Sequence, residues 1–167
     1  MIVFDNLLSD SQFEDFNKTF APISTGHWIG ASDEPTDKMA AYGKLLWKHY
    51  IAANPVPNLM GYEYWTNTLS NTVPLDWHYD KDEILWENTG EISRPLFGAV
   101  LYGEGEVYGG YLEIKQHDGE IERIQYKPNR AIFFDAGNLE HRVSPVSNGS
   151  RRTLACNIWD KELTTWK

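Results

Sequence analysis

The sequence predicts a mainly β fold with a layer of helices contributed by the N-terminal third of the chain. In that third, apolar residues recur at spacings of three and four, which is the period of a helix. From residue 59 onward, short runs rich in aromatic and β-branched residues alternate with turn residues about every ten positions. About eight short strands after a helical layer favour a jelly-roll barrel with the helices packed on one face. An immunoglobulin-like sandwich has the same number of strands, and the pattern alone does not separate the two.

Length and composition predict one domain. The chain has 167 residues, of which 41% are hydrophobic and 14% aromatic, and this is enough for one core without disulfides. No repeat or low-complexity linker divides the sequence. We therefore expect a single domain over residues 1–167, with the helical layer at about 9–54 and the barrel at about 59–159.

The helical layer is expected to contain two helices. Ser9 and Gln12 carry the signature of a capping box, and three phenylalanines follow on one helical face. A second helix is expected from about residue 35 to residue 53, where apolar residues again have helical spacing. The two prolines within residues 54–57 end it.

The barrel is expected to contain eight strands and at least two tight hairpins. The strands are predicted at residues 60–69, 75–80, 95–102, 110–116, 120–126, 130–135, 140–146 and 151–159. Asp118-Gly119 lies between two alternating runs, a strong signal for a tight hairpin. Asn148-Gly149 gives the same signal between the last two strands.

Charge and cysteine content exclude several classes of function. With 15 basic and 24 acidic residues the net charge is −9, which disfavours general binding to nucleic acid. No apolar run approaches the roughly 20 residues of a membrane span, and the N-terminus lacks the pattern of a secretion signal. The single cysteine, Cys156, rules out a disulfide framework and fits a reducing compartment. We therefore expect a cytoplasmic protein.

Three side chains in the predicted strands are candidates for a metal site. His78 and Asp80 are two positions apart, so on a strand both point to the same face. His141 follows a later strand after a tight turn, and it can supply a third ligand. Two histidines and one carboxylate form the facial triad typical of non-haem Fe(II), although a zinc hydrolase could use the same groups. Because no thiolate is present among the three, the set favours iron.

A candidate anion site follows His141 on the last predicted strand. Arg151 and Thr153 share one face of that strand, while Arg152 points to the other. An inward arginine in a barrel is costly unless it meets an anion, and its planar guanidinium suits a carboxylate. One register step decides which arginine faces inward, and we expect Arg151 to do so.

Taken together, these motifs resemble the Fe(II)/2-oxoglutarate-dependent dioxygenases, and in particular their prolyl-4-hydroxylase-like branch. The resemblance is carried by His78-x-Asp80 and by the run from His141 to Thr153, HRVSPVSNGSRRT, which is similar to the branch pattern H-x-V-x-P-V-x-x-G-x-R-x-S/T. Upstream, residues 99–102 (AVLY) and 109–114 (GGYLEI) are similar to a second stretch of that branch. The resemblance covers about residues 59–159 and implies a double-stranded β-helix, the cupin-like form of the jelly roll.

The resemblance also implies an activity and roles for individual residues. Fe(II) would be bound by His78, Asp80 and His141, and the distal carboxylate of 2-oxoglutarate by Arg151 and Thr153. Tyr102 matches a position that contacts this carboxylate in some relatives. The expected reaction hydroxylates an unactivated C–H bond with O₂, and it releases succinate and CO₂. The sequence departs from the pattern after Tyr102, where Gly103-Glu104 replaces the usual residues.

The substrate is left open by the sequence. The C-terminal motif favours a prolyl or other residue in a protein, and a free amino acid or other small molecule is the alternative. A non-catalytic cupin-like metal-binding protein is the alternative of another class, and a nucleic-acid dealkylase is disfavoured by the charge. The branch often has a tyrosine shortly before its His-x-Asp, for which Tyr62 and Tyr64 are the nearest candidates. The polar segment 81–93 is expected to be a mobile lid or a solvated loop.

Overall fold

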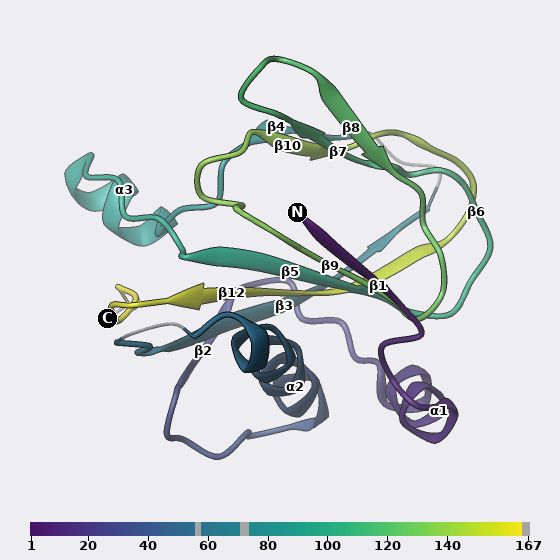
Figure 1. Ribbon diagram of the computed structural model, residues 1–167, viewed down its shortest axis with the longest axis horizontal. Helices are drawn as coiled ribbons and strands as arrows, with labels where there is room; N and C mark the ends of the chain where they lie inside the picture. Colours follow the sequence, from purple (N-terminus) through teal and green to yellow (C-terminus); the bar gives the residue numbers. More distant parts are fainter. Residues whose placement is uncertain (56–57, 71–73, 165–167) are drawn as a thin grey trace.

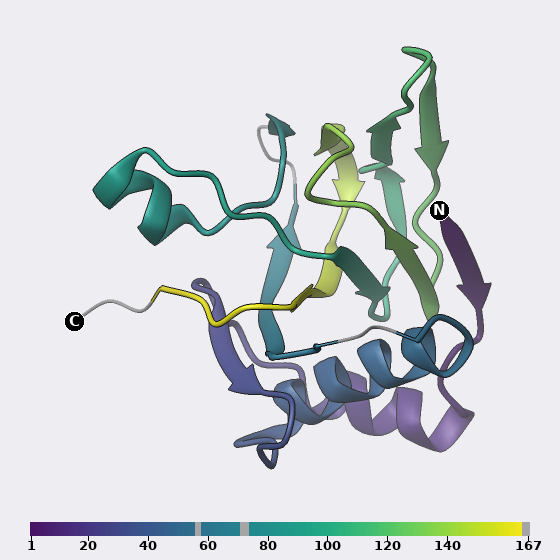
Figure 2. The same cartoon turned by 60° about the vertical axis from the view of Figure 1, so that its left-hand side comes forward.

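The computed structural model describes residues 1–55, 58–70 and 74–164. Within these residues two antiparallel sheets face each other, and two helices cover the outer side of the larger sheet (Figures 1 and 2). This is the jelly-roll arrangement with helices on one face that the sequence predicts.

The larger sheet has six strands and forms the floor of the molecule. Their order is β1 (Ile2–Asp5), β9 (Arg130–Phe134), β5 (Phe97–Tyr102), β12 (Arg151–Trp159), β3 (Gly61–Leu69) and β2 (His27–Gly30). β12 lies in the interior of the sheet and pairs with β3 over its whole length and with β5 on its other side. Among the described strands, β12 therefore has the most paired residues to fix its register.

The smaller sheet and a two-stranded ribbon form the opposite wall. The smaller sheet has the order β4 (Leu75–His78), β10 (His141–Val143), β7 (Leu112–Lys115) and β8 (Ile121–Ile124). The ribbon consists of β6 (Val107–Gly109) and β11 (Val146–Gly149).

One of the two predicted hairpins is confirmed and the other is wrong. β7 and β8 are joined through Asp118-Gly119, and Gly119 has the positive φ of +88° that such a turn requires. Asn148-Gly149, by contrast, lies inside β11, which pairs with β6 and not with β12. Gly149 also has a positive φ, +84°, and a Cβ there would overlap the carbonyl oxygen of Glu106. Glycine is required here by the positive φ and by the close approach of the neighbouring strand, and not by a hairpin turn.

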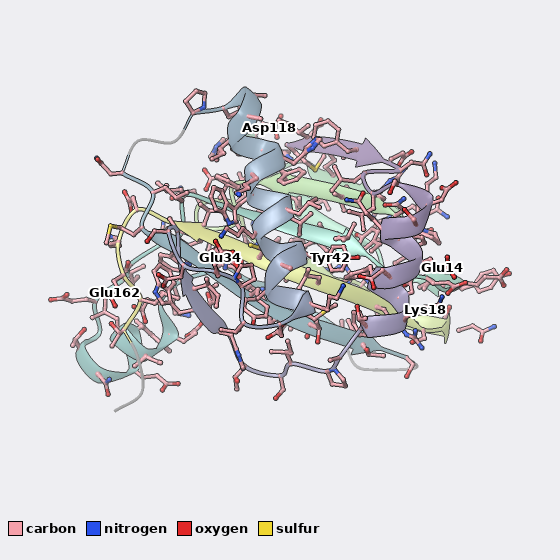
Figure 3. All side chains as sticks on the ribbon, turned by 90° about the horizontal axis from the view of Figure 1, so that it is seen from below. Glu14, Lys18, Glu34, Tyr42, Asp118 and Glu162 are labelled. Carbon is pink, nitrogen blue, oxygen red and sulfur yellow. The ribbon has the colours of Figure 1, made fainter. Side chains whose placement is uncertain are left out.

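The helices follow the predicted caps. α1 (Asp10–Thr19) begins with the capping box: the Gln12 backbone N–H donates to Ser9 Oγ over 3.3 Å, and the Ser9 N–H donates to Gln12 Oε1 over 3.0 Å. α2 (Lys38–Ala53) starts a few residues later than predicted because Asp37 is its cap, accepting from the Ala40 N–H over 2.9 Å. Both helices lie across the underside of the large sheet (Figure 3).

The core consists of two buried clusters, one on each side of the large sheet. The cluster between the helices and the large sheet includes the side chains of Phe16, Leu46, Tyr62, Leu154, Cys156 and Ile158. The cluster between the sheets includes Tyr102, Leu112, Ile114, Ile132 and Phe134. Because neighbouring residues of a strand point to opposite faces, β12 supplies the first cluster with every second residue and leaves the others for the space between the sheets.

Four short strands and one short helix were not predicted. β1 and β2 are four-residue strands at the two edges of the large sheet, and β6 and β11 form the short ribbon. Such short strands are too brief to show an alternating pattern. The predicted polar segment 81–93 contains α3 (Glu83–Thr89), none of whose seven described residues is buried. Among the described residues, no helix has the length and apolar character needed to cross a membrane.

Candidate active site

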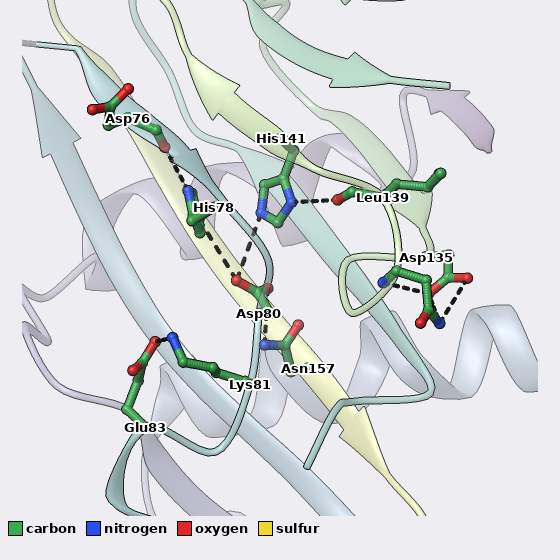
Figure 4. A network of polar contacts seen from close by, with 10 residues as sticks. Asp76, His78, Asp80, Lys81, Glu83, Asp135, Leu139, His141 and Asn157 are labelled. Atoms are coloured by element: carbon green, nitrogen blue, oxygen red, sulfur yellow. Dashed lines mark hydrogen bonds and ion pairs between the residues drawn. The ribbon is translucent and has the colours of Figure 1, made fainter. Parts of the chain in front are cut away.

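The two predicted histidine ligands lie directly opposite each other on neighbouring strands. His78 ends β4 and His141 begins β10, and the two are paired in register. Asp80 follows His78 by two residues, and its Oδ1 lies 3.7 Å from His78 Nε2 and 3.6 Å from His141 Nε2 (Figure 4). One ligand atom from each of the three residues lies within 4.8 Å of the other two. The structure therefore brings the three predicted ligands together at one point.

Both imidazole rings are oriented by the backbone. His78 Nδ1 lies 2.7 Å from the carbonyl oxygen of Asp76, and His141 Nδ1 lies 3.0 Å from that of Leu139. A carbonyl oxygen can only accept a hydrogen bond, so each Nδ1 carries the proton. In the neutral form of each ring, Nε2 then has a free lone pair directed at the common point, which is how histidine ligands are held in metal sites.

The Asp80 carboxylate is held in place from two sides. Its backbone N–H donates to the carbonyl oxygen of Ala136 over 2.9 Å, and its Oδ2 accepts from Asn157 Nδ2 over 3.0 Å. Burial opposes ionisation of this carboxyl, but His141, His78 and Asn157 outweigh burial, so the pKa of Asp80 lies below its usual value. Asp80 is therefore ionised at neutral pH, the form in which a carboxylate binds a metal ion.

Arg151 is buried at the start of β12, on the strand face that also carries Asn157. Its side chain is 2% exposed, its Nε donates to the carbonyl oxygen of Gly110 over 3.1 Å, and its guanidinium lies 5.0 Å from the centre of the Tyr102 ring. Nη2 lies 3.5 Å from the Tyr102 hydroxyl, and Nη1 has no hydrogen bond to any residue that the structure describes. A buried guanidinium with unused donors fits an anionic partner.

The register of β12 is the one predicted from the sequence. Thr153 is 1% exposed and lies on the same face as Arg151. Arg152 points to the other side, where its guanidinium lies 6.0 Å from the Phe20 ring. Tyr102 lies behind Arg151 and stacks on Tyr126, with ring centres 4.8 Å apart. Tyr102 thus supports the arginine from the core.

One cavity of about 270 Å³ joins the two groups of polar residues. His78, Asp80 and His141 line it together with Arg151 and Thr153. Between these polar groups its wall is largely apolar, formed by Ala99, Val100, Leu112, Phe134, Val143 and Ala155. The cavity has space for a small dianion that reaches from the arginine to a metal ion at the histidines.

Sequence reasoning missed several residues of the cavity. Asn157 was detectable, because it follows Arg151 and Thr153 at even spacing on the same strand face. Gly98 lies beside it: a Cβ there would come within 2.7 Å of the Ala136 Cβ and 2.9 Å of Asn157 Oδ1. Ser24 comes from a connection between elements, where no periodic signal exists.

The two candidate tyrosines before His-x-Asp do not face the cavity. Tyr62 and Tyr64 point to the helices, where their hydroxyls donate to the Ala40 carbonyl oxygen over 2.9 Å and to Asp37 Oδ2 over 2.7 Å. Their neighbour Trp65 lines the cavity instead. Neither tyrosine is therefore a cosubstrate contact.

The jelly roll, the His-Asp-His cluster and the buried arginine fit a non-haem metal oxygenase. Comparison with protein families agrees: residues 64–159 match the 2OG-Fe(II) oxygenase superfamily. The chain belongs to this superfamily, and it is accordingly a dioxygenase that uses Fe(II), 2-oxoglutarate and O₂. The donor set fits the metal, because it offers two imidazoles and a carboxylate with free lone pairs.

Solved structures with the same fold include several prolyl hydroxylases. A prolyl-4-hydroxylase from Pseudomonas putida is 18% identical, with 96% of this chain and 92% of that chain covered and a TM-score of 0.67. The viral collagen prolyl hydroxylase of Paramecium Bursaria Chlorella virus-1, in complex with 2OG, is 17% identical over 94% and 93%, with a TM-score of 0.59. A Trichoplax adhaerens prolyl hydroxylase, bound to a peptide of hypoxia inducible factor, is 12% identical over 95% and 83%, also with a TM-score of 0.59. A search of curated protein sequences finds no match.

Proposed function

We propose that His78, Asp80 and His141 bind Fe(II), and that Arg151 and Thr153 bind the distal carboxylate of 2-oxoglutarate. The observation that carries this proposal is the single cavity in which the three ligands and the buried guanidinium meet. The unused donor of Arg151 supports an anion at its end, and the two backbone-oriented imidazoles support a metal at the other.

In this proposal the protein positions its reactants and excludes water. When bound, Fe(II) with 2-oxoglutarate and O₂ supplies the oxidising power that hydroxylates an unactivated C–H bond, with release of succinate and CO₂. Asn157 holds the Asp80 carboxylate in one orientation, and Tyr102 supports the guanidinium of Arg151. The apolar wall between the two polar ends keeps the space around the reacting centre dry.

The proposed substrate is a prolyl or other residue within a peptide or protein. The three similar structures named above are prolyl hydroxylases, and one of them holds a peptide. A second cavity adjoins the active-site cavity and shares Ser24, Trp65, Asp80 and Asn157 with it, which supports a substrate larger than one residue. The proposed location is the cytoplasm, which is compatible with a free, buried thiol at Cys156.

The test is an anaerobic titration of the metal-free protein with Fe(II) and then with 2-oxoglutarate. We expect the visible charge-transfer band of the chelate to appear with one equivalent of each. A folded, iron-loaded protein without the band would contradict the proposed function.

A variant and its matched control make the titration specific. In Asp80→Ala the band is lost, because one of the three ligands is gone. Asp160→Ala, at an exposed acidic residue just beyond β12, removes the same charge and keeps the band. Equal titrations of the two variants would contradict the assigned role of Asp80.

A further inference from the structure

Two further cavities follow the active-site cavity in a row, the first adjoining the active site and the second adjoining the first. The first, of about 220 Å³, shares Ser24, Trp65, Asp80 and Asn157 with the active site and is also lined by Glu63. The second, of about 490 Å³, shares Glu63 with the first and extends to Trp28 and Leu163. Glu63 therefore stands between the reaction centre and the larger outer cavity.

Glu63 lies at the end of the active site that is opposite to Arg151. In the sheet it pairs with Asn157, whereas Arg151 is six residues away along β12. Six residues of an extended strand span about 20 Å. Because the proposed 2-oxoglutarate site occupies the Arg151 end, the side of Glu63 is left for the substrate.

The chain makes room for the Glu63 carboxyl but gives it no counter-charge. A Cβ on Gly26 would overlap this carboxyl, so glycine at that position leaves its place free. Among the described residues, no basic side chain forms an ion pair with Glu63. The basic residue in the wall of the first cavity, Lys81, pairs with Glu83 over 2.8 Å and lies 4.5 Å from the centre of the Trp86 ring.

The surroundings of Glu63 favour a positively charged group. Burial and the charges of Asp80, Asp82 and Glu83 together raise the pKa of Glu63 to about 7, against an opposing hydrogen bond from Asn157. An incoming cation would relieve this repulsion. The two aromatic residues that flank Glu63 in the cavity walls, Trp28 and Trp65, are of the type whose ring faces attract cations.

We propose that Glu63 is a specificity-determining residue that selects substrates carrying an organic cation, an ammonium or guanidinium group, beside the C–H bond to be hydroxylated. The inference rests on the proposed function and narrows it: the expected substrate is a peptide with a basic side chain close to the hydroxylated residue. The same chemistry could come from the amino group of a free amino acid, so the experiment includes both sources.

The experiment measures binding under anaerobic conditions, where no turnover takes place. Protein loaded with Fe(II) and 2-oxoglutarate is titrated calorimetrically with short, blocked peptides that have a central proline and one lysine at varied positions. Each peptide has an isosteric twin with norleucine in place of lysine, and free L-lysine is tested separately. Glu63→Gln is compared with wild type, and Glu120→Gln, at an exposed position on the β7–β8 hairpin, is the matched control.

We expect at least one lysine peptide to bind wild type about tenfold more tightly than its norleucine twin. The ratio should fall to near one in Glu63→Gln, persist in Glu120→Gln, and decrease as salt is raised. Glu63-dependent binding of free L-lysine alone would support the cation and assign it to a small-molecule substrate. Two results would overturn the inference. In the first, the two twins bind equally or not at all at every position, and L-lysine does not bind. In the second, the preference for lysine survives in Glu63→Gln. The chelate band, recorded in the same samples, shows separately whether the proposed function stands.

Discussion

The two faces of β12 are both buried, yet they differ in chemistry. Apart from the exposed Arg152 near the start of the strand, the residues that face the helices are apolar or weakly polar, Leu154, Cys156 and Ile158, and each is fully buried. The residues on the other face are Arg151, Thr153, Ala155 and Asn157, and they line the cavity. A single strand thus supplies the packed core on one side and a polar site on the other.

This difference suggests that stability and function are divided between the faces. The helix face gains its free energy from close packing and from removal of apolar surface from water. The cavity face holds polar groups whose partners are a carboxylate, a proposed cosubstrate and, through Asp80, a proposed metal ion. Substitutions on the two faces should therefore have different measurable effects.

The largest expected effect is on the helix face. Leu154→Ala truncates a fully buried side chain in the cluster between the helices and the large sheet, and we expect a loss of about 2–5 kcal/mol in the free energy of unfolding. Urea denaturation measures the loss. In the molecules that remain folded, affinity for Fe(II) and 2-oxoglutarate should be unchanged, and a weaker chelate would show that the two faces are coupled.

The next effect is on the cavity face. Arg151→Ala should lower the affinity for 2-oxoglutarate about 100-fold, or roughly 2.7 kcal/mol, because the carboxylate loses its buried partner. Arg152→Ala is the matched control and should leave the affinity close to wild type, since this side chain points to Phe20. The chelate band, titrated with 2-oxoglutarate, measures both. If Arg152→Ala had the larger effect, the assignment of the inward arginine would be wrong.

The division between the two faces was predictable from the sequence because alternation along a strand is a local rule. It placed Arg151 inward and Arg152 outward, and it brought His78 and Asp80 to one side of their strand. The same rule applied to β12 would have added Asn157 to the predicted residues of the active site. Motif spacing was also sufficient to select His141 as the third member of the cluster.

Other features depend on contacts between distant segments, which no local pattern encodes. Glu63 lines the two outer cavities because Gly26, just before β2, lies against it, and because Asp82 follows the strand that carries His78. Asn148-Gly149 predicted a hairpin because this dipeptide is typical of tight turns, but only Gly149 has a positive φ, and pairing with β6 decided the topology. The edge strands β1 and β2 are defined by their neighbours in the sheet and not by a hydrophobic period of their own.

A smaller effect is expected where the protein supports a ligand indirectly. Asn157→Ala removes the hydrogen bond to Asp80 Oδ2, and we expect affinity for Fe(II) to fall about tenfold. The free energy of unfolding of the metal-free protein should change much less than in Leu154→Ala. Asn88→Ala, at an exposed position on α3, serves as the control for loss of an amide. Unchanged metal affinity in Asn157→Ala would show that Asp80 needs no support.

The smallest effect concerns the pH dependence of stability, and it originates at Glu63 on the cavity face of β3. The pKa of Glu63 is raised from its usual 4.5 to about 7 by burial and by neighbouring acids. Between these values the unfolded chain has lost this proton while the folded chain retains it, so the contribution of Glu63 to stability falls as the pH rises through this window.

Glu63→Gln has no such penalty. Because Glu63 is only partly buried, solvent screens part of this penalty, and we expect the metal-free variant to gain on the order of 1 kcal/mol relative to wild type at pH 8 compared with pH 5. Urea denaturation at both pH values measures the difference, and Glu120→Gln should show none. The same relative stability at both pH values would mean that Glu63 is solvated, and it would weaken the contrast between a packed face and a polar cavity face.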